Sequence, residues 1–116
     1  MRDGLAEPAR LRPEVLAAVQ EPFRKAEARR ALAAAGIGLS RKGFAQIASQ
    51  LSTLRIPVRV VYGGQDRVLP DVGETMARVK VDLPQADVTV LPDCGHFVQE
   101  EAPADVGALL ARFFAL

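Results

Sequence analysis

The sequence predicts an α/β fold in which two parallel strands are flanked by helices. Two β-branched runs, at about residues 57–62 and 87–91, are the predicted strands, and each ends at a glycine or proline that favours a turn. The segment between them carries apolar residues at helical spacing, so it predicts a crossover helix. A strand, a helix and a second strand in this order indicate a parallel pair with a right-handed connection.

The residues before the first strand predict only helices and turns. Pro13 and Pro22 each stand where a helix can begin, because the first helical position needs no N–H donor. The second of these helices is predicted to be stopped by Gly36 together with Gly38. A third helix is expected from about Lys42 to Leu54. Its apolar stripe consists of Phe44, Ile47, Leu51 and Leu54.

The residues after the first strand predict two further helices. The crossover helix is expected from about Asp71 to Leu83, and the last helix is expected to begin near Pro103. The last helix has a complete stripe at core-facing positions: Val106, Leu109, Leu110, Phe113 and Phe114. With both strands parallel, their carboxyl ends lie at one edge of the sheet, where open α/β sheets carry ligand chemistry.

Composition and charge exclude several classes of protein. Of the 116 residues, 49% are apolar and 25% are charged, and the net charge of +1 favours neither nucleic acid nor a membrane surface as a partner. The single cysteine, Cys94, forms no intrachain disulfide, which fits a reducing compartment. No apolar run approaches the roughly 20 residues needed to span a bilayer, and the first residues lack a secretory signal. The expected location is cytoplasmic.

Two side chains suited to acid–base chemistry follow the two predicted strands. Asp66 comes after the pair Gly63 and Gly64, and His96 comes after Gly95. Because paired strands lie about 4.8 Å apart, the two loops leave one edge side by side, and a hydrogen bond between Asp66 and His96 is expected. Such a bond holds an imidazole in one tautomer and stabilises its protonated form. Each residue alone is more simply a turn or surface residue, so the pair carries the prediction.

The segments around these residues resemble the C-terminal half of an α/β-hydrolase-fold enzyme. The resemblance is carried by Ile56–Pro70, Leu83–Ala86 and Cys94–Pro103. The pattern Gly-His-Phe-x-Gln-Glu-x-x-Pro is most similar to the haloalkane dehalogenase and epoxide hydrolase branch, and many esterases and C–C hydrolases share it loosely. The order of the acid before the histidine is also that of the family.

The resemblance implies a role for each part of the chain. Asp66 is expected to be the acid and His96 the base of a catalytic triad. Residues 1–41 are expected to be a helical segment from the end of a cap (lid). Residues 42–116 are expected to be the C-terminal half of the hydrolase core, that is, a partial α/β-hydrolase fold without its N-terminal strands.

The nucleophile of such an enzyme does not occur in the chain. Neither Gly-x-Ser-x-Gly nor Gly-x-Asp-x-Gly is found, and the oxyanion-hole loop has no counterpart. Two apolar parallel strands also leave a sheet edge unpaired. Three states are therefore open: a truncated copy of a longer enzyme, a chain completed by a second chain, or a chain that associates with itself at the exposed edge. The isolated chain is expected to lack hydrolase activity above background.

Two functions are consistent with these observations. The first is a hydrolase, or a piece of one, acting on an ester, epoxide or carbon–halogen bond of a small molecule with an outside Ser or Asp nucleophile. The second is a non-catalytic remnant that acts as a self-associating structural module. No cofactor or metal is expected, because one Cys and one His cannot close a structural zinc site with the usual ligands.

Other polar residues near the histidine have structural explanations. Cys94 is better explained as a half-buried thiol than as a nucleophile, because two-residue spacing rarely directs both side chains of a Cys–His pair correctly. Gln99, Glu100 and Glu101 are expected to cap the last helix, where acidic side chains suit the helix dipole. Tyr62 is expected to pack in the core.

Overall fold

A computed structural model describes residues 2–38 and 41–115, without the side chains of residues 2 and 41–44. The chain divides into two compact units, which we call the core unit and the helical unit. The core unit comprises Met1–Leu11 and Leu54–Leu116, and the helical unit comprises Arg12–Thr53. The predicted boundary at residue 41 falls inside the helical unit. The assignment of residues 1–41 to a cap stays a prediction.

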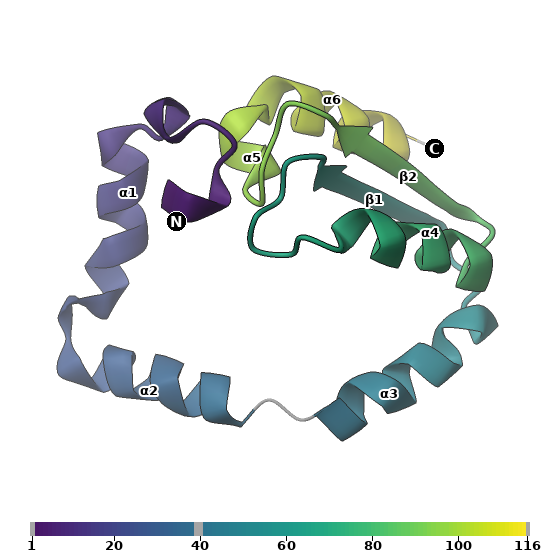
Figure 1. The fold of residues 1–116 in the computed structure, drawn as a ribbon, viewed down its shortest axis with the longest axis horizontal. Helices are drawn as coiled ribbons and strands as arrows, with labels where there is room; N and C mark the ends of the chain where they lie inside the picture. Colours follow the sequence, from purple (N-terminus) through teal and green to yellow (C-terminus); the bar gives the residue numbers. More distant parts are fainter. Residues whose placement is uncertain (1, 39–40, 116) are drawn as a thin grey trace. The chain divides into compact units, whose positions relative to one another are not determined.

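The core unit contains the predicted sheet. Strands β1 (Val58–Gly63) and β2 (Ala86–Leu91) pair in parallel. In the register, Val58 lies opposite Ala86 and Gly63 lies opposite Leu91. The predicted fold of two parallel strands with flanking helices is confirmed, and each strand lies within a residue of its expected bounds. Both strands end at the same edge of the sheet, as Figure 1 shows.

Helices cover both faces of this sheet (Figure 1). The crossover helix α4 (Val72–Asp82) contacts β2, and the last helix α6 (Pro103–Phe114) contacts β1. Met76 of α4 borders a hollow together with Val90, whereas Leu91 borders a different hollow with residues 102–105 at the start of α6. Because consecutive strand residues point to opposite faces, α4 and α6 lie on opposite sides.

Two parts of the core unit were not predicted. A single helical turn, α5 (Val98–Glu101), follows the histidine loop directly. The first residues form the 3₁₀ turns η1 (Arg2–Gly4) and η2 (Pro8–Arg10). They pack against the rest of the core unit, although the sequence indicated only a cap-like helical segment there. Between the two turns, Leu5 is fully buried, with 0% of its surface exposed.

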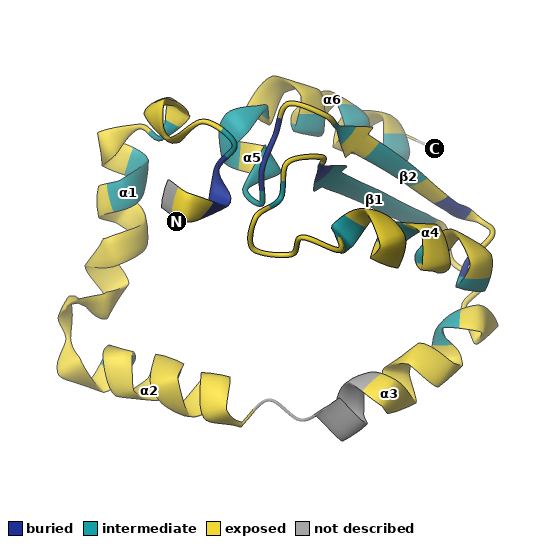
Figure 2. Cartoon of the chain, in the orientation of Figure 1, coloured by how far each residue is buried: buried dark blue, intermediate teal, exposed yellow. Residues whose placement is uncertain are grey.

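The buried core is small, as the few dark segments in Figure 2 show. Among the described residues, the buried apolar side chains are Leu5, Leu83, Ala86 and Cys94. The predicted core-facing stripe of α6 is wrong at Leu110 and Phe114, which are 40% and 76% exposed. The remaining stripe residues, such as Leu109, are half-buried. A helix that lies on one face of a sheet is covered on one side only. The apolar stripe of α6 is wider than that side, so part of the stripe stays exposed.

The helical unit contains α1 (Pro13–Gln20), α2 (Ala26–Ile37), α3 (Arg41–Gln50) and two 3₁₀ turns, η3 (Glu21–Arg24) and η4 (Leu51–Thr53). The prediction that Pro22 begins the second helix is wrong. Pro22 lies in η3, and Lys25, in an extended conformation with ψ 138°, separates that turn from α2. The third predicted helix ends in a 3₁₀ turn. The side chain of Phe44 lies outside the described residues.

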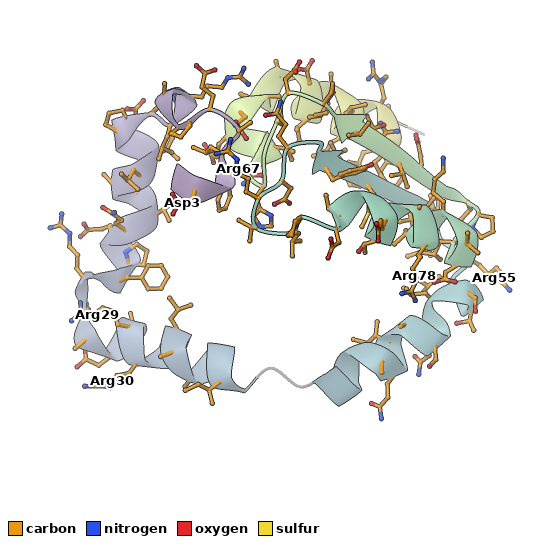
Figure 3. The ribbon with its side chains drawn as sticks, in the orientation of Figure 1. Asp3, Arg29, Arg30, Arg55, Arg67 and Arg78 are labelled. Carbon is orange, nitrogen blue, oxygen red and sulfur yellow. The ribbon has the colours of Figure 1, made fainter. Side chains whose placement is uncertain are left out.

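Local contacts dominate the helical unit. The Nη1 atom of Arg29 donates to the carbonyl oxygens of Phe23 and Arg24, at 2.9 and 2.7 Å, and ties α2 to the preceding turn. The exposed side chains of Arg29 and Arg30 are labelled in Figure 3. No residue of α1 or α2 is buried. In the described parts of the chain, no helix has the length and apolar character that crossing a membrane requires.

Candidate active site

The loops that follow β1 and β2 are joined by backbone hydrogen bonds. The N–H of Gly64 donates to the carbonyl oxygen of Leu91 at 2.9 Å, and the N–H of Gln65 donates to that of Cys94 at 2.9 Å. The side-chain amide of Gln65 adds a bond to the carbonyl oxygen of Pro92 at 3.3 Å. These bonds continue the pairing of the strands beyond the sheet, so the acid loop and the histidine loop are held side by side.

Gly63 allows this close approach at the end of β1. A Cβ atom at this position would overlap the carbonyl oxygens of Gly95 and Cys94, and it would lie 2.7 Å from the carbonyl carbon of Cys94. Backbone atoms of a neighbouring loop cannot retreat as a flexible side chain can. Glycine is therefore required here for space.

The hydrogen bond predicted between Asp66 and His96 is present. The Nδ1 atom of His96 lies 2.8 Å from Oδ2 of Asp66. The side chain of Asp66 is 5% exposed and that of His96 is 32% exposed. The other carboxylate oxygen, Oδ1, accepts the backbone N–H groups of Val68 and Leu69 at 2.8 and 2.9 Å. The sequence therefore predicted both residues and their contact.

The surroundings of Asp66 keep its carboxyl group ionised. Burial alone would raise the pKa of Asp66, but hydrogen bonds from the backbone of Leu69, from His96 and from the backbone of Val68 outweigh it. The pKa of Asp66 therefore lies below its ordinary value. An ionised carboxylate only accepts hydrogen bonds, so Nδ1 of His96 carries the proton toward Asp66.

The opposite ring nitrogen of His96 is then the basic one. In the neutral imidazole with a protonated Nδ1, the Nε2 atom has a free lone pair. Among the described residues, Nε2 of His96 takes part in no hydrogen bond, and about a third of the side chain is exposed. The ring of Phe97 packs edge-on against the imidazole, with centroids 5.1 Å apart and planes at 87°. The arrangement leaves a proton acceptor on a partly exposed side chain.

Cys94 lies in the same loop and is a structural thiol. It is buried, at 4% exposure. Burial raises the pKa of the Cys94 thiol, and the nearby carboxylate of Glu101 raises it further. Because the thiolate is the nucleophilic form, this thiol is not activated at neutral pH. These findings agree with the structural explanation offered for it from the sequence.

The expectation that Glu101 caps the last helix is wrong. Helix α6 has no side-chain cap, and Glu101 is the last residue of α5. Its carboxylate instead accepts backbone N–H groups from the histidine loop and from the N-terminal segment. Its partner Ala6 is 95 positions away in sequence, and no local pattern could have indicated that contact. In the described part of the chain, no cluster of three or more His, Cys, Asp or Glu side chains suits a metal ion.

A carboxylate–imidazole pair at the carboxyl edge of a parallel sheet, acid first in the chain, matches the order and placement of the acid and the histidine in α/β-hydrolase-fold proteins. The comparison with protein families agrees with this fold class. The sequence model of the alpha/beta hydrolase family matches residues 2–109, so the chain belongs to that family. The fold is a partial α/β-hydrolase fold, and the resemblance found from the sequence is confirmed at this level. The haloalkane dehalogenase and epoxide hydrolase branch stays a prediction.

Three curated relatives illustrate what the chain is similar to. It is 29% identical over 77 residues to monoacylglycerol lipase ABHD6 of Bos taurus, covering 66% of this chain and 22% of the lipase. The 2-hydroxy-6-oxononadienedioate/2-hydroxy-6-oxononatrienedioate hydrolase of Burkholderia vietnamiensis is 38% identical over 73 residues, covering 62% of this chain and 24% of that enzyme. The hydrolase of the same name from Pseudomonas sp is 34% identical over 74 residues, covering 63% and 25%. The chain thus spans about a quarter of the length of these relatives.

Proposed function

We propose that Asp66 and His96 are the acid and the base of a hydrolase triad whose nucleophile lies outside residues 1–116. The observation that carries this proposal is the 2.8 Å bond between Nδ1 of His96 and Oδ2 of Asp66. The bond leaves Nε2 as the basic atom of a side chain that is about a third exposed. Membership of the α/β hydrolase family supports the same reading.

The chemistry of this pair depends on the nucleophile that completes it. If the nucleophile is a serine, Nε2 of His96 accepts the hydroxyl proton as the oxygen attacks a carbonyl carbon, and the imidazolium then protonates the leaving group. If the nucleophile is an aspartate, its carboxylate displaces the leaving group at carbon. His96 then accepts a proton from the water that hydrolyses the covalent ester. In both cases the Asp66 carboxylate stabilises the imidazolium.

A carboxylic ester of a small molecule is the proposed substrate class. The similarity to a monoacylglycerol lipase supports an ester substrate. Epoxides and carbon–halogen bonds are the second candidates, supported by the pattern Gly-His-Phe-x-Gln-Glu-x-x-Pro that begins at Gly95. The two candidates predict different intermediates, an acyl-serine and an alkyl-aspartate ester, which mass spectrometry of a trapped enzyme separates.

A completed enzyme tests the proposal. The 116-residue chain replaces the part of the Burkholderia hydrolase that contains the matched 73-residue segment, the remainder of that hydrolase completes the fold, and turnover of a p-nitrophenyl ester is measured. We expect turnover that falls by roughly 10⁴-fold in Asp66→Asn, because an amide favours the wrong imidazole tautomer. Asp71→Asn is the matched control, since Asp71 is an exposed acid in the same loop region. Equal rates in both variants contradict the proposed triad.

The isolated chain provides the complementary test. Without a nucleophile and oxyanion donors, it is expected to hydrolyse the same ester no faster than buffer does. Turnover that is lost in His96→Ala would show that the chain supplies its own nucleophile. If the completed enzyme is folded yet inactive, the alternative of a non-catalytic, self-associating module is favoured, and light scattering of the isolated chain then measures its association.

A further inference from the structure

A short segment that we call the strap, residues 4–10, crosses the loop that carries His96. The backbone N–H of His96 donates to the carbonyl oxygen of Gly4 in the strap. A Cβ atom at Gly95 would lie 2.6 Å from the backbone nitrogen of Ala6. Together with the full burial of Leu5, this spacing means that the strap and the histidine loop touch backbone to backbone.

The carboxylate of Glu101 joins the strap to the loop. Its Oε2 atom accepts the N–H of Gly95 at 2.6 Å, and its Oε1 atom accepts the N–H groups of Ala6 and Glu7 at 2.9 and 3.2 Å. One side chain thus satisfies three backbone donors that come from two segments. Hydrogen bonds of an N–H group to a carboxylate are among the stronger ones in proteins.

The side chain of Arg10 makes a second link between the strap and the histidine loop. Arg10 of the strap donates from Nη1 to the carbonyl oxygen of Asp93 in the loop at 3.3 Å, while its Nε lies 3.1 Å from Glu7. The loop backbone is therefore held at Asp93, at Gly95 and at His96. Because the backbone at these two residues sets where the imidazole points, the strap contacts bear directly on the bond between His96 and Asp66.

We propose that Glu101 is a positioning residue for His96, and that it acts by clamping the strap onto the histidine loop. The proposal rests on the proposed function, because it gives Glu101 a role in the reaction of the Asp66–His96 pair. Glu101 does not touch the reacting atoms. It fixes the direction of the imidazole, so its loss lowers the rate of proton transfer more than it weakens the binding of substrate.

The first measurement uses the isolated 116-residue chain and needs no turnover. His96 is the only histidine, so the imidazole signals in a ¹H–¹⁵N spectrum belong to it alone. Glu101→Gln keeps the shape of the side chain but has one acceptor oxygen in place of two, so it cannot serve both segments. We expect loss or exchange broadening of the Nδ1–H signal in this variant. Glu100→Gln, one residue away in the same helix, is expected to keep the signal.

The second measurement uses the completed enzyme and separates kcat from KM. With Glu101→Gln, we expect kcat to fall by about 10²-fold, the cost typical of a small misplacement of a catalytic group, while KM stays the same within about threefold. Glu100→Gln is expected to leave both constants unchanged. If the completed enzyme is inactive even with Glu101 present, the proposed function fails, and the imidazole spectrum still decides the role of Glu101.

A second variant, Ala6→Pro, applies if Glu101→Gln disturbs the sheet. Ala6→Pro removes one of the three donors and leaves the carboxylate in place, so a weaker version of the same spectral change is expected. Slow exchange of the β1 and β2 amides serves as the check of the fold. An unchanged imidazole signal in both variants overturns the proposal, because Glu101 would then have no effect on the direction of the imidazole. Loss of the sheet in both variants also overturns it, because Glu101 would then stabilise the whole fold.

Discussion

The two compact units of the chain contain helices of similar length, but different contacts hold them. In the core unit, backbone groups of the strap, the acid loop and the histidine loop bond to each other across long sequence separations. In the helical unit, the polar contacts described above are short-range, and so is the ion pair between Arg30 and Glu27 three residues away. The core unit also buries Leu5 and Leu83, whereas α1 and α2 bury no residue.

This difference shows what an apolar stripe does and does not specify. Both units carry helical patterns, and helices form at most of the predicted positions in both. A helix of about 10 residues is only marginally stable in water without tertiary packing. The pattern therefore predicts where a helix lies, and the long-range contacts decide which helices are firmly held.

The largest effect is expected from Gly63→Ala in the core unit. The added methyl group overlaps the histidine loop, so the loops must separate or the strand must shift, at a cost of about 3 kcal/mol in the free energy of unfolding. Urea denaturation followed by circular dichroism measures it. Gly107→Ala is the control, because among the described residues no atom outside its chain neighbours and its own helix backbone lies within 4 Å of its Cβ position in α6, and it is expected to stabilise the chain by about 0.5–1 kcal/mol. A neutral Gly63→Ala would mean that the loops are not in contact.

Hydrogen exchange measures the contrast between the units directly. Amides of β1 and β2 are expected to exchange roughly a hundredfold more slowly than those of α1 and α2, since exposed helices without buried side chains open locally. Mass spectrometry of peptides from each unit gives the ratio. Equal protection in the two units would show that the helical unit is held by contacts beyond the local ones described above.

The acid dependence of stability is expected to trace to Asp66. Its pKa is lower in the folded chain than in the unfolded one. The contribution of Asp66 to stability is therefore fully present above the unfolded pKa of about 3.9 and is lost as pH falls through the folded pKa. Asp66→Asn is expected to remove about 1 kcal/mol at neutral pH and to flatten this part of the curve. Denaturation of both proteins between pH 7 and pH 2 tests it; parallel curves argue against the inferred sign.

The smallest effect is expected in the helical unit. The ion pair of Arg30 with Glu27 spans 3.3 Å, and both side chains are about three-quarters exposed. Such pairs are screened by water and salt, so Arg30→Ala is expected to change the free energy of unfolding by less than about 0.5 kcal/mol. Denaturation at low and high salt checks this. A larger, salt-dependent loss would mean that surface charge is important for holding this unit together.

The sequence predicted the strands and the site because both are encoded locally. The β-branched run before Gly63 and the one before Pro92 specify the strands, and Asp66 and His96 follow them at short distance. The parallel pairing then requires the two loops to be neighbours, so the contact between them was predictable without coordinates. The extended residue Lys25, which interrupts the second predicted helix, has no comparable signal.

The strap and the role of Glu101 could not be predicted from the sequence, for a physical reason. Periodicity and turn residues report on neighbours within a few positions, whereas the N–H group of Ala6 meets Glu101 from 95 positions away. A carboxylate after a histidine loop fits a helix cap equally well by composition. Only the backbone donors that surround Glu101 distinguish the two roles. For the same reason, the exposure of Phe114 could not be read from its position in an apolar stripe.

The separation of Asp66 and His96 by 30 positions has a genetic consequence. A single short segment encodes both members of the pair, so a gene fusion or recombination event with a junction within residues 12–53 transfers acid and base together. The strap is encoded more than 40 residues earlier and does not travel with them. A recipient enzyme would inherit the paired acid and base intact. Its own backbone N–H groups would have to replace those of the strap as donors to Glu101.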